Sequence, residues 1–150
     1  MANSYVRIIL HCVWSTKHRD MVIHPDWEEG LWAYIGGIAR NHGIHPIQIG
    51  GIENHIHAVV EPPKSMDLPE LIQILKAPSS KWINNGGKIT GNFHWQDGYG
   101  AFSVSPSLLS RVVRYVRHQR EHHRTRTFEE EYRELLKWHG IPYDEAYLLG

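Results

Sequence analysis

The sequence is poor in several features that mark special classes of protein. It has a single cysteine, Cys12, which excludes an internal disulfide framework and suits a reducing cytoplasm. It contains no apolar run long enough to span a membrane. Its first residues lack the basic region of a signal peptide and lead directly into a strand pattern. We therefore expect a cytoplasmic protein without a membrane segment.

The length and composition favour one globular domain covering residues 1–150. A chain of 150 residues with 41% hydrophobic and 21% charged residues can bury a substantial core. It shows no internal repeat, linker or low-complexity segment that would divide it. Function therefore has to be sought in one domain.

The formal net charge is zero, but the charges are segregated in the last third of the chain. Residues 107–126 hold six arginines and one acid, whereas residues 127–150 hold six acids and two basic residues. Such a basic stripe can bind phosphates in a neutral protein. Alternatively, the arginines pair with the acidic helix that follows. Both readings stay open from the sequence.

Apolar periodicity predicts an ordered series of strands and helices. Glycines 50 and 51 are expected to form a turn, and Pro78 is expected to kink or break its helix. The order strand-helix-strand-strand-helix-strand is ferredoxin-like, an α+β fold with an antiparallel sheet, here followed by two C-terminal helices. The first and third strands should be central, two helices should cover one sheet face, and the open face should hold the site. The expected elements are strands at 5–16, 44–49, 54–60 and 101–104, and helices at 25–41, 67–84, 108–119 and 128–138.

Two histidines, His55 and His57, flank Ile56 within the third predicted strand. Residues two apart on a strand point to the same side, about 6–7 Å from each other, so both imidazoles can reach one metal ion. With 12 histidines in the chain, however, close pairs also arise by chance. His11 on the first strand is expected to be a hydrogen-bonded neighbour of the pair rather than a ligand.

A tyrosine and a glutamine share one face of the helix predicted near residue 115. Tyr115 and Gln119 are four residues apart, which places them one helical turn from each other. The phenol offers a nucleophilic oxygen, and the amide offers a neutral oxygen ligand. His118 and His122 are also four apart and form a rival candidate for a zinc site.

A strand with His-hydrophobic-His, followed by a helix with Tyr-x-x-x-Gln, resembles the HUH-type single-tyrosine transposases of bacterial insertion sequences. The resemblance is to the insertion-sequence 200/605 group and its REP-associated relatives. Residues 13–19, 95–103, 119–123 and 128–132 are also similar to segments of that family, in the same order. The similarity extends over nearly the whole chain. Asn54 is a departure, because relatives often carry an acid before the first histidine.

This resemblance implies a metal-dependent transposase that nicks and rejoins single-stranded DNA at hairpin-bearing element ends. Tyr115 would form a 5′-phosphotyrosine intermediate, and His55, His57 and Gln119 would hold Mg²⁺ or Mn²⁺. The resemblance also implies a homodimer, in which the tyrosine helix of one subunit completes the metal site of the other. The sequence itself does not decide whether the tyrosine acts in cis or in trans.

Basic residues near the expected site are candidates for holding the DNA backbone, namely Lys17, Arg19, Arg111, Arg114 and Arg117. Aromatic residues in the 93–99 segment either stack on unpaired bases or fill the core. Two other functions remain open: a hairpin-DNA-binding protein that no longer cuts, and a metal-dependent phosphoesterase that uses water. Neither of them needs a tyrosine nucleophile.

Overall fold

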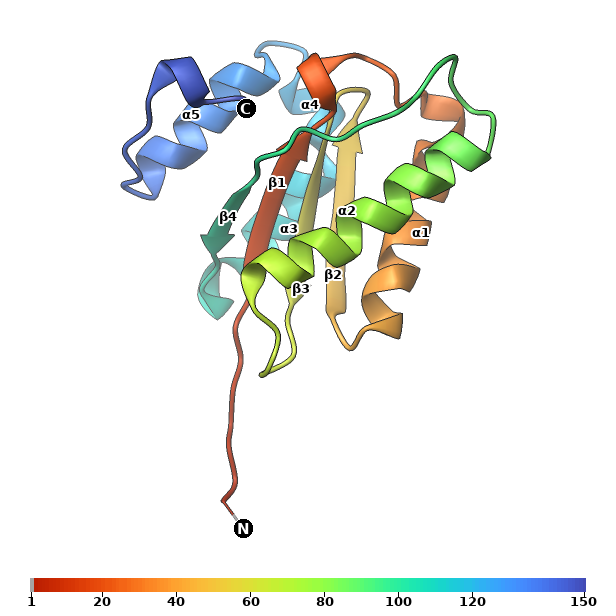
Figure 1. Cartoon of the computed structure of the whole chain (residues 1–150). Helices are drawn as coiled ribbons and strands as arrows, with labels where there is room; N and C mark the ends of the chain where they lie inside the picture. The colour runs from red at the N-terminus through yellow and green to blue at the C-terminus, as the bar shows by residue number, and fades with distance from the viewer. Residues whose placement is uncertain (1) are drawn as a thin grey trace.

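The computed structural model describes residues 2–150, which form a four-stranded antiparallel sheet in the order β2-β3-β1-β4 with helices on both faces (Figure 1). The predicted α+β order is confirmed, and β1 and β3 are the central strands as expected. The strands are β1 Leu10–Ser15, β2 His45–Ile52, β3 His55–Glu61 and β4 Gly100–Ser103. The α-helices are α1 Pro25–Asn41, α2 Leu68–Asn85, α3 Leu109–Arg117, α4 Gln119–His122 and α5 Phe128–Trp138. Short 3-10 turns are η1 Lys17–Arg19, η2 Pro106–Leu108 and η3 Glu145–Tyr147.

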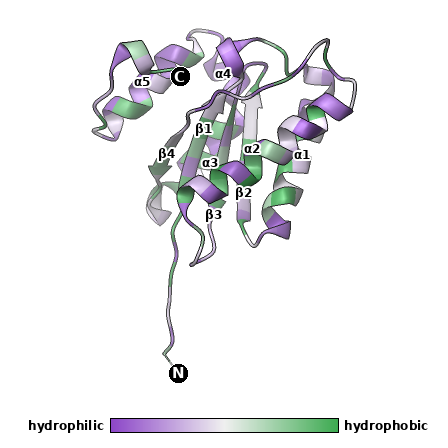
Figure 2. Cartoon of the chain, in the orientation of Figure 1, coloured by the Kyte–Doolittle hydropathy of each residue, from purple (hydrophilic) through white to green (hydrophobic). Residues whose placement is uncertain are grey.

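One face of the sheet carries the main apolar core under α1 and α2. Cys12 and Trp14 of β1 and Ile56 of β3 are fully buried there, against Leu31 of α1 and Leu75 of α2. Figure 2 shows hydrophilic and hydrophobic bands on both helices, as expected for helices with one buried side. Within residues 2–150, the structure has no helix long and apolar enough to cross a membrane.

Helix α1 has the bounds that the sequence predicts, but Pro78 does not break α2. The helix runs without interruption through this proline from Leu68 to Asn85. The proline removes the donor to the Ile74 carbonyl, and next to it the Ser79 hydroxyl donates to the Leu75 and Lys76 carbonyls at 2.6 and 2.9 Å. Buried Leu75 and Ile83 anchor both halves of α2 to the sheet. Tertiary packing therefore overrides the local cost of the proline.

Two strand boundaries also differ from the sequence prediction. Strand β1 begins at Leu10 rather than at residue 5, and Val6 and Ile8 are half exposed. In the described chain the paired registers of β3 and β4 with β1 end at Leu10, so the preceding residues extend away from the sheet (Figure 1). Gly50 and Gly51 lie inside β2, and the turn to β3 falls at residues 53–54.

The aromatic residues of the segment after α2 fill the core rather than face solvent. Phe93 and Trp95 are 2% and 6% exposed and contact each other edge to face. Trp95 also packs edge to face on Trp14, and its indole N–H donates to the Ser79 hydroxyl. Base stacking by these two residues is therefore excluded while the core is intact.

The second face of the sheet is not open, contrary to the prediction. Helix α3 lies behind the strands in Figure 1, and α5 packs beside β4. Val116 of α3 packs on Val59 and Ile9, whereas Phe128 of α5 belongs to a cluster with Val13. The sequence prediction failed because it treated the C-terminal helices as additions beyond the sheet. They instead cover the face that carries His55 and His57.

Candidate metal and nucleophile site

The histidine pair lies on the central strand β3, in positions opposite Ser15 and Val13 of β1. Both rings are fully buried, with their centroids 5.1 Å apart. Asn54 Oδ1 lies 2.8 Å from His55 Nδ1, and His11 Nε2 lies 2.7 Å from His57 Nδ1. His11 is thus the hydrogen-bonded neighbour that was predicted. These partners orient both rings and leave both Nε2 atoms directed at the helices above.

Glycine 50 allows α3 to come close to this part of the sheet. It pairs with His57 across β2 and β3, and a Cβ atom at this position would lie 2.8 Å from the Val116 carbonyl oxygen. Any side chain would therefore push α3 outward. The predicted helix ends at His118 and resumes as α4, but Tyr115 and Gln119 remain one turn apart, with Gln119 Nε2 3.5 Å from the Tyr115 carbonyl.

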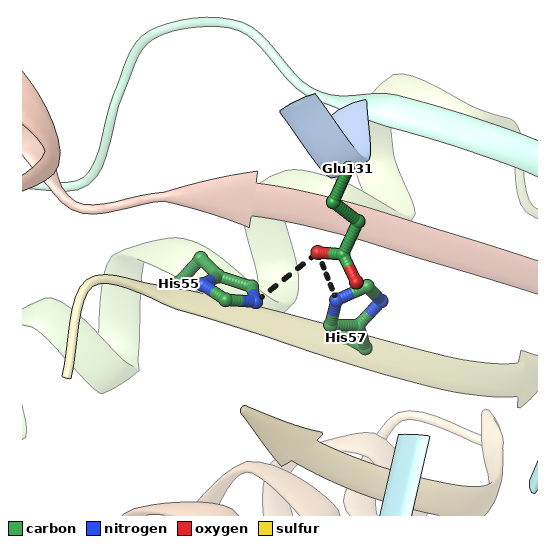
Figure 3. A group of neighbouring side chains, drawn as sticks. All are labelled: His55, His57 and Glu131. Atoms are coloured by element: carbon green, nitrogen blue, oxygen red, sulfur yellow. Dashed lines mark hydrogen bonds and ion pairs between the residues drawn. The ribbon is translucent and has the colours of Figure 1, made fainter. Parts of the chain in front are cut away.

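A carboxylate from α5 completes the cluster. A capping box between Thr127 and Glu130 begins α5, and one residue further on Glu131 enters the protein with no exposed surface. Figure 3 shows its carboxylate between the two rings that project from β3. Glu131 Oε1 lies 3.1 Å from His57 Nε2 and 3.3 Å from His55 Nε2.

Gln119 and Tyr115 meet the same carboxylate from the other side. Gln119 Oε1 is 2.8 Å from His55 Nε2, and its amide nitrogen donates to Glu131 Oε2 at 3.1 Å. The Tyr115 hydroxyl donates to Glu131 Oε2 and accepts from Arg126 Nη2 at 2.7 Å. Glu131 therefore links the histidine pair to the phenol, with one oxygen directed at each.

The protonation states follow from burial and from these contacts. Burial lowers the pKa of His55 to about 4, although Glu131 opposes the shift, so this ring is neutral at pH 7. Burial alone would raise the pKa of Glu131, but His57 and hydrogen bonds from the surrounding histidines hold it well below its usual range. Burial and the neighbouring Glu131 raise the pKa of Tyr115, and Arg126 only partly opposes them. The cluster thus combines a neutral imidazole, a carboxylate and a protonated phenol.

The donor set fits a divalent metal ion. One ligand atom from each of His55, His57 and Glu131 lies within 4.8 Å of the other two, and all three residues are buried. A neutral imidazole with a bare nitrogen and an ionised carboxylate are the forms that bind metal. Imidazole nitrogens with carboxylate or amide oxygens suit several divalent ions. The arrangement can therefore hold an ion within reach of the Tyr115 side chain.

A cavity of about 490 Å³ adjoins the phenol, between α3, α5 and β4. Tyr115 and Glu131 form part of its wall, and Phe102 and Trp138 contribute aromatic surface. Trp138 is 87% exposed to solvent. Arg111 also lines the cavity and adds positive charge near Tyr115. A planar group with a neighbouring phosphate would match this lining.

Comparison with known proteins identifies the family. The family described as transposase IS200 like matches residues 4–119 of this chain. The chain belongs to the IS200-like transposases. Among curated relatives, the ISDra2 transposase TnpA of Deinococcus radiodurans is 22% identical over 116 residues, which cover 74% of this chain and 83% of that protein. The function class is therefore DNA transposition.

Solved structures agree with this IS200-like fold. A crystal structure assigned as a transposase from Deinococcus radiodurans R1 superposes with a TM-score of 0.63 at 21% identity, covering 79% of this chain and 96% of that one. A REP-associated tyrosine transposase bound to a REP hairpin gives a TM-score of 0.59 at 13% identity, covering 82% and 73%. At these identities the similarity concerns the fold.

The structure of this IS200-like transposase brings four of the predicted site residues together and spreads the predicted DNA contacts more widely. His55, His57, Tyr115 and Gln119 converge around one carboxylate within a single chain. Arg111 lines the cavity, whereas the remaining basic candidates lie elsewhere. Arg114, Arg117 and Lys17 are exposed, Arg117 donates to Gln48 Oε1 at 3.3 Å, and Arg19 donates to the Leu149 carbonyl at 3.2 Å.

The ion-pair reading of the arginine stripe is confirmed for two of its residues, and the phosphate-binding reading stays a prediction. Arg126 pairs with Glu131 and Glu134 of the acidic helix, and Arg120 pairs with Glu28 and Glu53. Arg111, in contrast, faces the cavity. The side chains of His118 and His122, the rival candidates for a zinc site, do not converge. His118 Nδ1 bonds the Arg114 carbonyl, and His122 packs on the Tyr115 ring.

Sequence reasoning missed Glu131 and Arg126 and left the role of His123 open. All three lie beyond the segment that matches the family. For Glu131 a signal was present. Phe128, Glu131 and Tyr132 follow the helical spacing of the buried side of α5, and an acid on an apolar helix face indicates a buried partner. Arg126 and His123 lie in a turn between two helices, where no periodicity marks them.

Proposed function

We propose that this transposase cleaves and rejoins single-stranded DNA with Tyr115 as the nucleophile and a divalent metal ion held by His55, His57 and Glu131. One observation carries the proposal: the phenol of Tyr115 and the Nε2 atoms of both histidines converge on the two oxygens of one buried carboxylate. Gln119 Oε1, 2.8 Å from His55 Nε2, is placed to join the same ion. A protein that only bound DNA would not need a nucleophile beside a metal site.

The chemistry is a transfer of one phosphodiester bond. The Tyr115 oxygen attacks the phosphorus, the bond to the 3′ oxygen breaks, and the products are a 5′-phosphotyrosine and a free 3′-OH. The phenolic proton passes to Glu131 Oε2, which already accepts the hydrogen bond from that hydroxyl. Glu131 then releases this proton to solvent, from which the departing 3′ oxygen takes a proton. Attack of another 3′-OH on the phosphotyrosine reverses these changes and joins a new strand without ATP.

The residues around the phenol prepare it for this step. Because burial raises the pKa of Tyr115, the hydroxyl stays protonated until a base takes its proton, and the ionised Glu131 is in contact with it. Arg126 donates to the phenol oxygen at 2.7 Å, so it orients a lone pair and stabilises the negative charge that develops there. The bound ion would polarise the phosphoryl oxygen and stabilise the departing 3′ oxygen. Mg²⁺ and Mn²⁺ both perform this chemistry.

For the substrate we propose single-stranded DNA with a hairpin, as in the hairpin complex of the REP-associated transposase. The cavity beside Tyr115 offers aromatic surface for one unpaired base, and Arg111 offers charge for a neighbouring phosphate. Location in the cytoplasm and a homodimer remain predictions. Since one chain supplies the histidines and the tyrosine together, we propose that the tyrosine acts in cis.

The test is to incubate the protein with hairpin-bearing single-stranded DNA, labelled at its 3′ end, and Mn²⁺. A covalent adduct would appear as a denaturation-resistant labelled band. Tyr115→Phe should abolish this band while hairpin binding survives, and Tyr147→Phe, which changes an exposed tyrosine, should leave it intact. His57→Ala or a chelator should also abolish the band.

Each alternative predicts another pattern. An adduct undiminished in Tyr115→Phe would remove this residue from the role, and equal adduct with chelator present would contradict the metal. Binding without any adduct in the natural sequence would support a non-cutting protein. Cleavage that persists in Tyr115→Phe without an adduct would support a phosphoesterase that uses water. Mixing Tyr115→Phe with His57→Ala protein should not restore the band if the tyrosine acts in cis, whereas restoration would support a dimer with shared sites.

A further inference from the structure

A third imidazole reaches the cluster from the end of α4. His123 follows the last residue of that helix, and its side chain is 5% exposed. Its Nε2 atom lies 3.1 Å from Gln119 Oε1 and 3.1 Å from Glu131 Oε1, and its ring centroid is 4.5 Å from that of His55. The same two oxygens that face His55 therefore also face His123.

The hydrogen bond on the far side of this ring fixes its tautomer. His123 Nδ1 lies 3.0 Å from the Arg126 carbonyl oxygen, which can only accept, so Nδ1 carries the hydrogen. In the neutral ring Nε2 then has a bare lone pair. This is the form that binds a metal ion.

The groups opposite His123 Nε2 are also acceptors. Glu131 accepts the hydrogen bond of the Tyr115 hydroxyl, and the orientation of the Gln119 amide follows from its nitrogen, which lies 3.1 Å from Glu131 Oε2 and 3.5 Å from the Tyr115 carbonyl. Both of those neighbours accept hydrogen bonds, so the amide oxygen is the atom that faces the histidines. A nitrogen lone pair directed at two oxygen lone pairs is unfavourable unless a proton or a metal ion lies between them.

The spacing of these atoms corresponds to that of ligands around one ion. The contacts that join His55, His57 and His123 to the two oxygens measure 2.8–3.3 Å. For metal–ligand bonds of about 2.1 Å, ligand atoms are about 3.0 Å apart along an octahedral edge and about 3.4 Å apart along a tetrahedral edge. Each of these contacts therefore has the length of one edge of a coordination shell. His123 lies outside the group whose ligand atoms are all within 4.8 Å of one another, so its ring has to shift towards the ion to bind it.

We propose that His123 is a further ligand of the same ion, so that three imidazole nitrogens make the site selective for a transition metal, such as Mn²⁺, over Mg²⁺. This inference rests on the proposed metal site and deepens it. Mg²⁺ prefers oxygen ligands and retains its waters, whereas imidazole suits transition ions. Five protein atoms around an octahedral ion leave one position, which is what a phosphate oxygen requires. The competing explanation is an ion pair, in which a protonated His123 neutralises Glu131 without binding metal.

The test measures metal binding by the full chain in the absence of DNA. Isothermal titration with Mn²⁺ and with Mg²⁺ should give at least about 100-fold tighter binding of Mn²⁺, and His123→Ala should weaken Mn²⁺ binding by about 10–100-fold. The binding of Mg²⁺ should change much less. His118→Ala is the matched control, because that histidine is exposed and its Nδ1 bonds the Arg114 carbonyl rather than the cluster, and it should bind Mn²⁺ as the natural sequence does.

Electron spin resonance of the Mn²⁺ complex provides a readout of the ligands themselves. Nitrogen couplings should correspond to three imidazoles, and His123→Ala should lose one of them, with circular dichroism used to show that the variant is folded. Unchanged Mn²⁺ affinity in folded His123→Ala would overturn the inference in favour of the ion pair. Absence of Mn²⁺ binding by the natural sequence would overturn it as well. The covalent-adduct assay decides the proposed function separately, since Tyr115→Phe should bind Mn²⁺ normally.

Discussion

Along β3 the two faces of the sheet are equally buried, but the residues that they bury differ in chemistry. On β3, Ile56, Ala58 and Val60 have no exposed surface on the face under α1 and α2, and His55 and His57 have none on the face under α3 and α5. The first face is an apolar core in which shape and volume determine stability. The second contains ionisable groups whose burial is tolerated only because each has a partner. Burial therefore does not distinguish a core from a site, whereas the donors and acceptors do.

The polar face is stabilised by a connected network rather than by separate pairs. Asn54 and His11 contact the Nδ1 atoms of His55 and His57, respectively. Glu131 Oε1 lies within 3.3 Å of both Nε2 atoms. Arg126 contacts both Glu131 and the Tyr115 oxygen. Removing one member leaves others unsatisfied in a medium of low dielectric, so such networks respond strongly to single substitutions. We expect changes on this face to affect activity first and changes on the apolar face to affect stability first.

The substitution Glu131→Gln tests the polar face and should have the largest effect. It keeps the size of the side chain but removes the charge that faces the histidines and the base that faces Tyr115. We expect covalent-adduct formation with Mn²⁺ to fall by about 1,000-fold, equivalent to about 4 kcal/mol in the barrier. Single-turnover kinetics on hairpin DNA provide the measurement.

A neighbouring acid on α5 supplies the control for that change. Glu129→Gln removes a charge from the same helical turn without touching the cluster, and should react at the rate of the natural sequence. If Glu131→Gln were equally fast, the carboxylate would be a structural partner of the histidines, and the metal and base roles would both have to be abandoned.

On the apolar face, Leu75→Ala should give the opposite result. Leu75 is fully buried in the core between α2 and the sheet, and its truncation leaves a cavity. We expect a loss of about 2–5 kcal/mol in the free energy of unfolding, measured by urea denaturation. The adduct rate per folded molecule should be unchanged in the presence of saturating DNA and Mn²⁺. A large drop in that rate would show that the two faces are coupled through the strands.

The same contrast explains how much of the molecule could be predicted from its sequence. Periodic patterns gave the bounds of α1 and α5 and the central position of β3, because those signals are local. The prediction failed at Pro78, at the start of β1 and at the covered sheet face, where packing between distant segments decides the outcome. In the site, His55, His57, Tyr115 and Gln119 were recognisable because their motifs resemble those of the transposase family. His123 and Arg126 were not, because their roles depend on a turn that only the folded chain defines.

Gly50 shows how a local sequence signal can be misinterpreted. This glycine was expected to form a turn, but in the structure it allows α3 to approach β2. Gly50→Ala would place a Cβ atom 2.8 Å from the Val116 carbonyl and 3.3 Å from its Cγ1, so α3 must move away from β2. We expect a loss of about 1–3 kcal/mol in stability. Because Tyr115 moves with α3, adduct formation should also fall by about 10-fold or more. Both effects are smaller than the effects on the two faces themselves.

Gly37→Ala is the control for the effects of Gly50→Ala on stability and on the adduct rate. Gly37 lies within α1, where an added Cβ would meet nothing within 4 Å, so Gly37→Ala should stabilise the protein by about 1 kcal/mol and leave the adduct rate unchanged. Opposite signs for the two substitutions would show that Gly50 is needed for the approach of α3 rather than for backbone freedom. If Gly50→Ala were as stable and as active as the natural sequence, α3 would not be held against β2, and the nucleophile would need another means of positioning. Tyr115 would then be free to serve a neighbouring subunit, which is the arrangement that the cis proposal excludes.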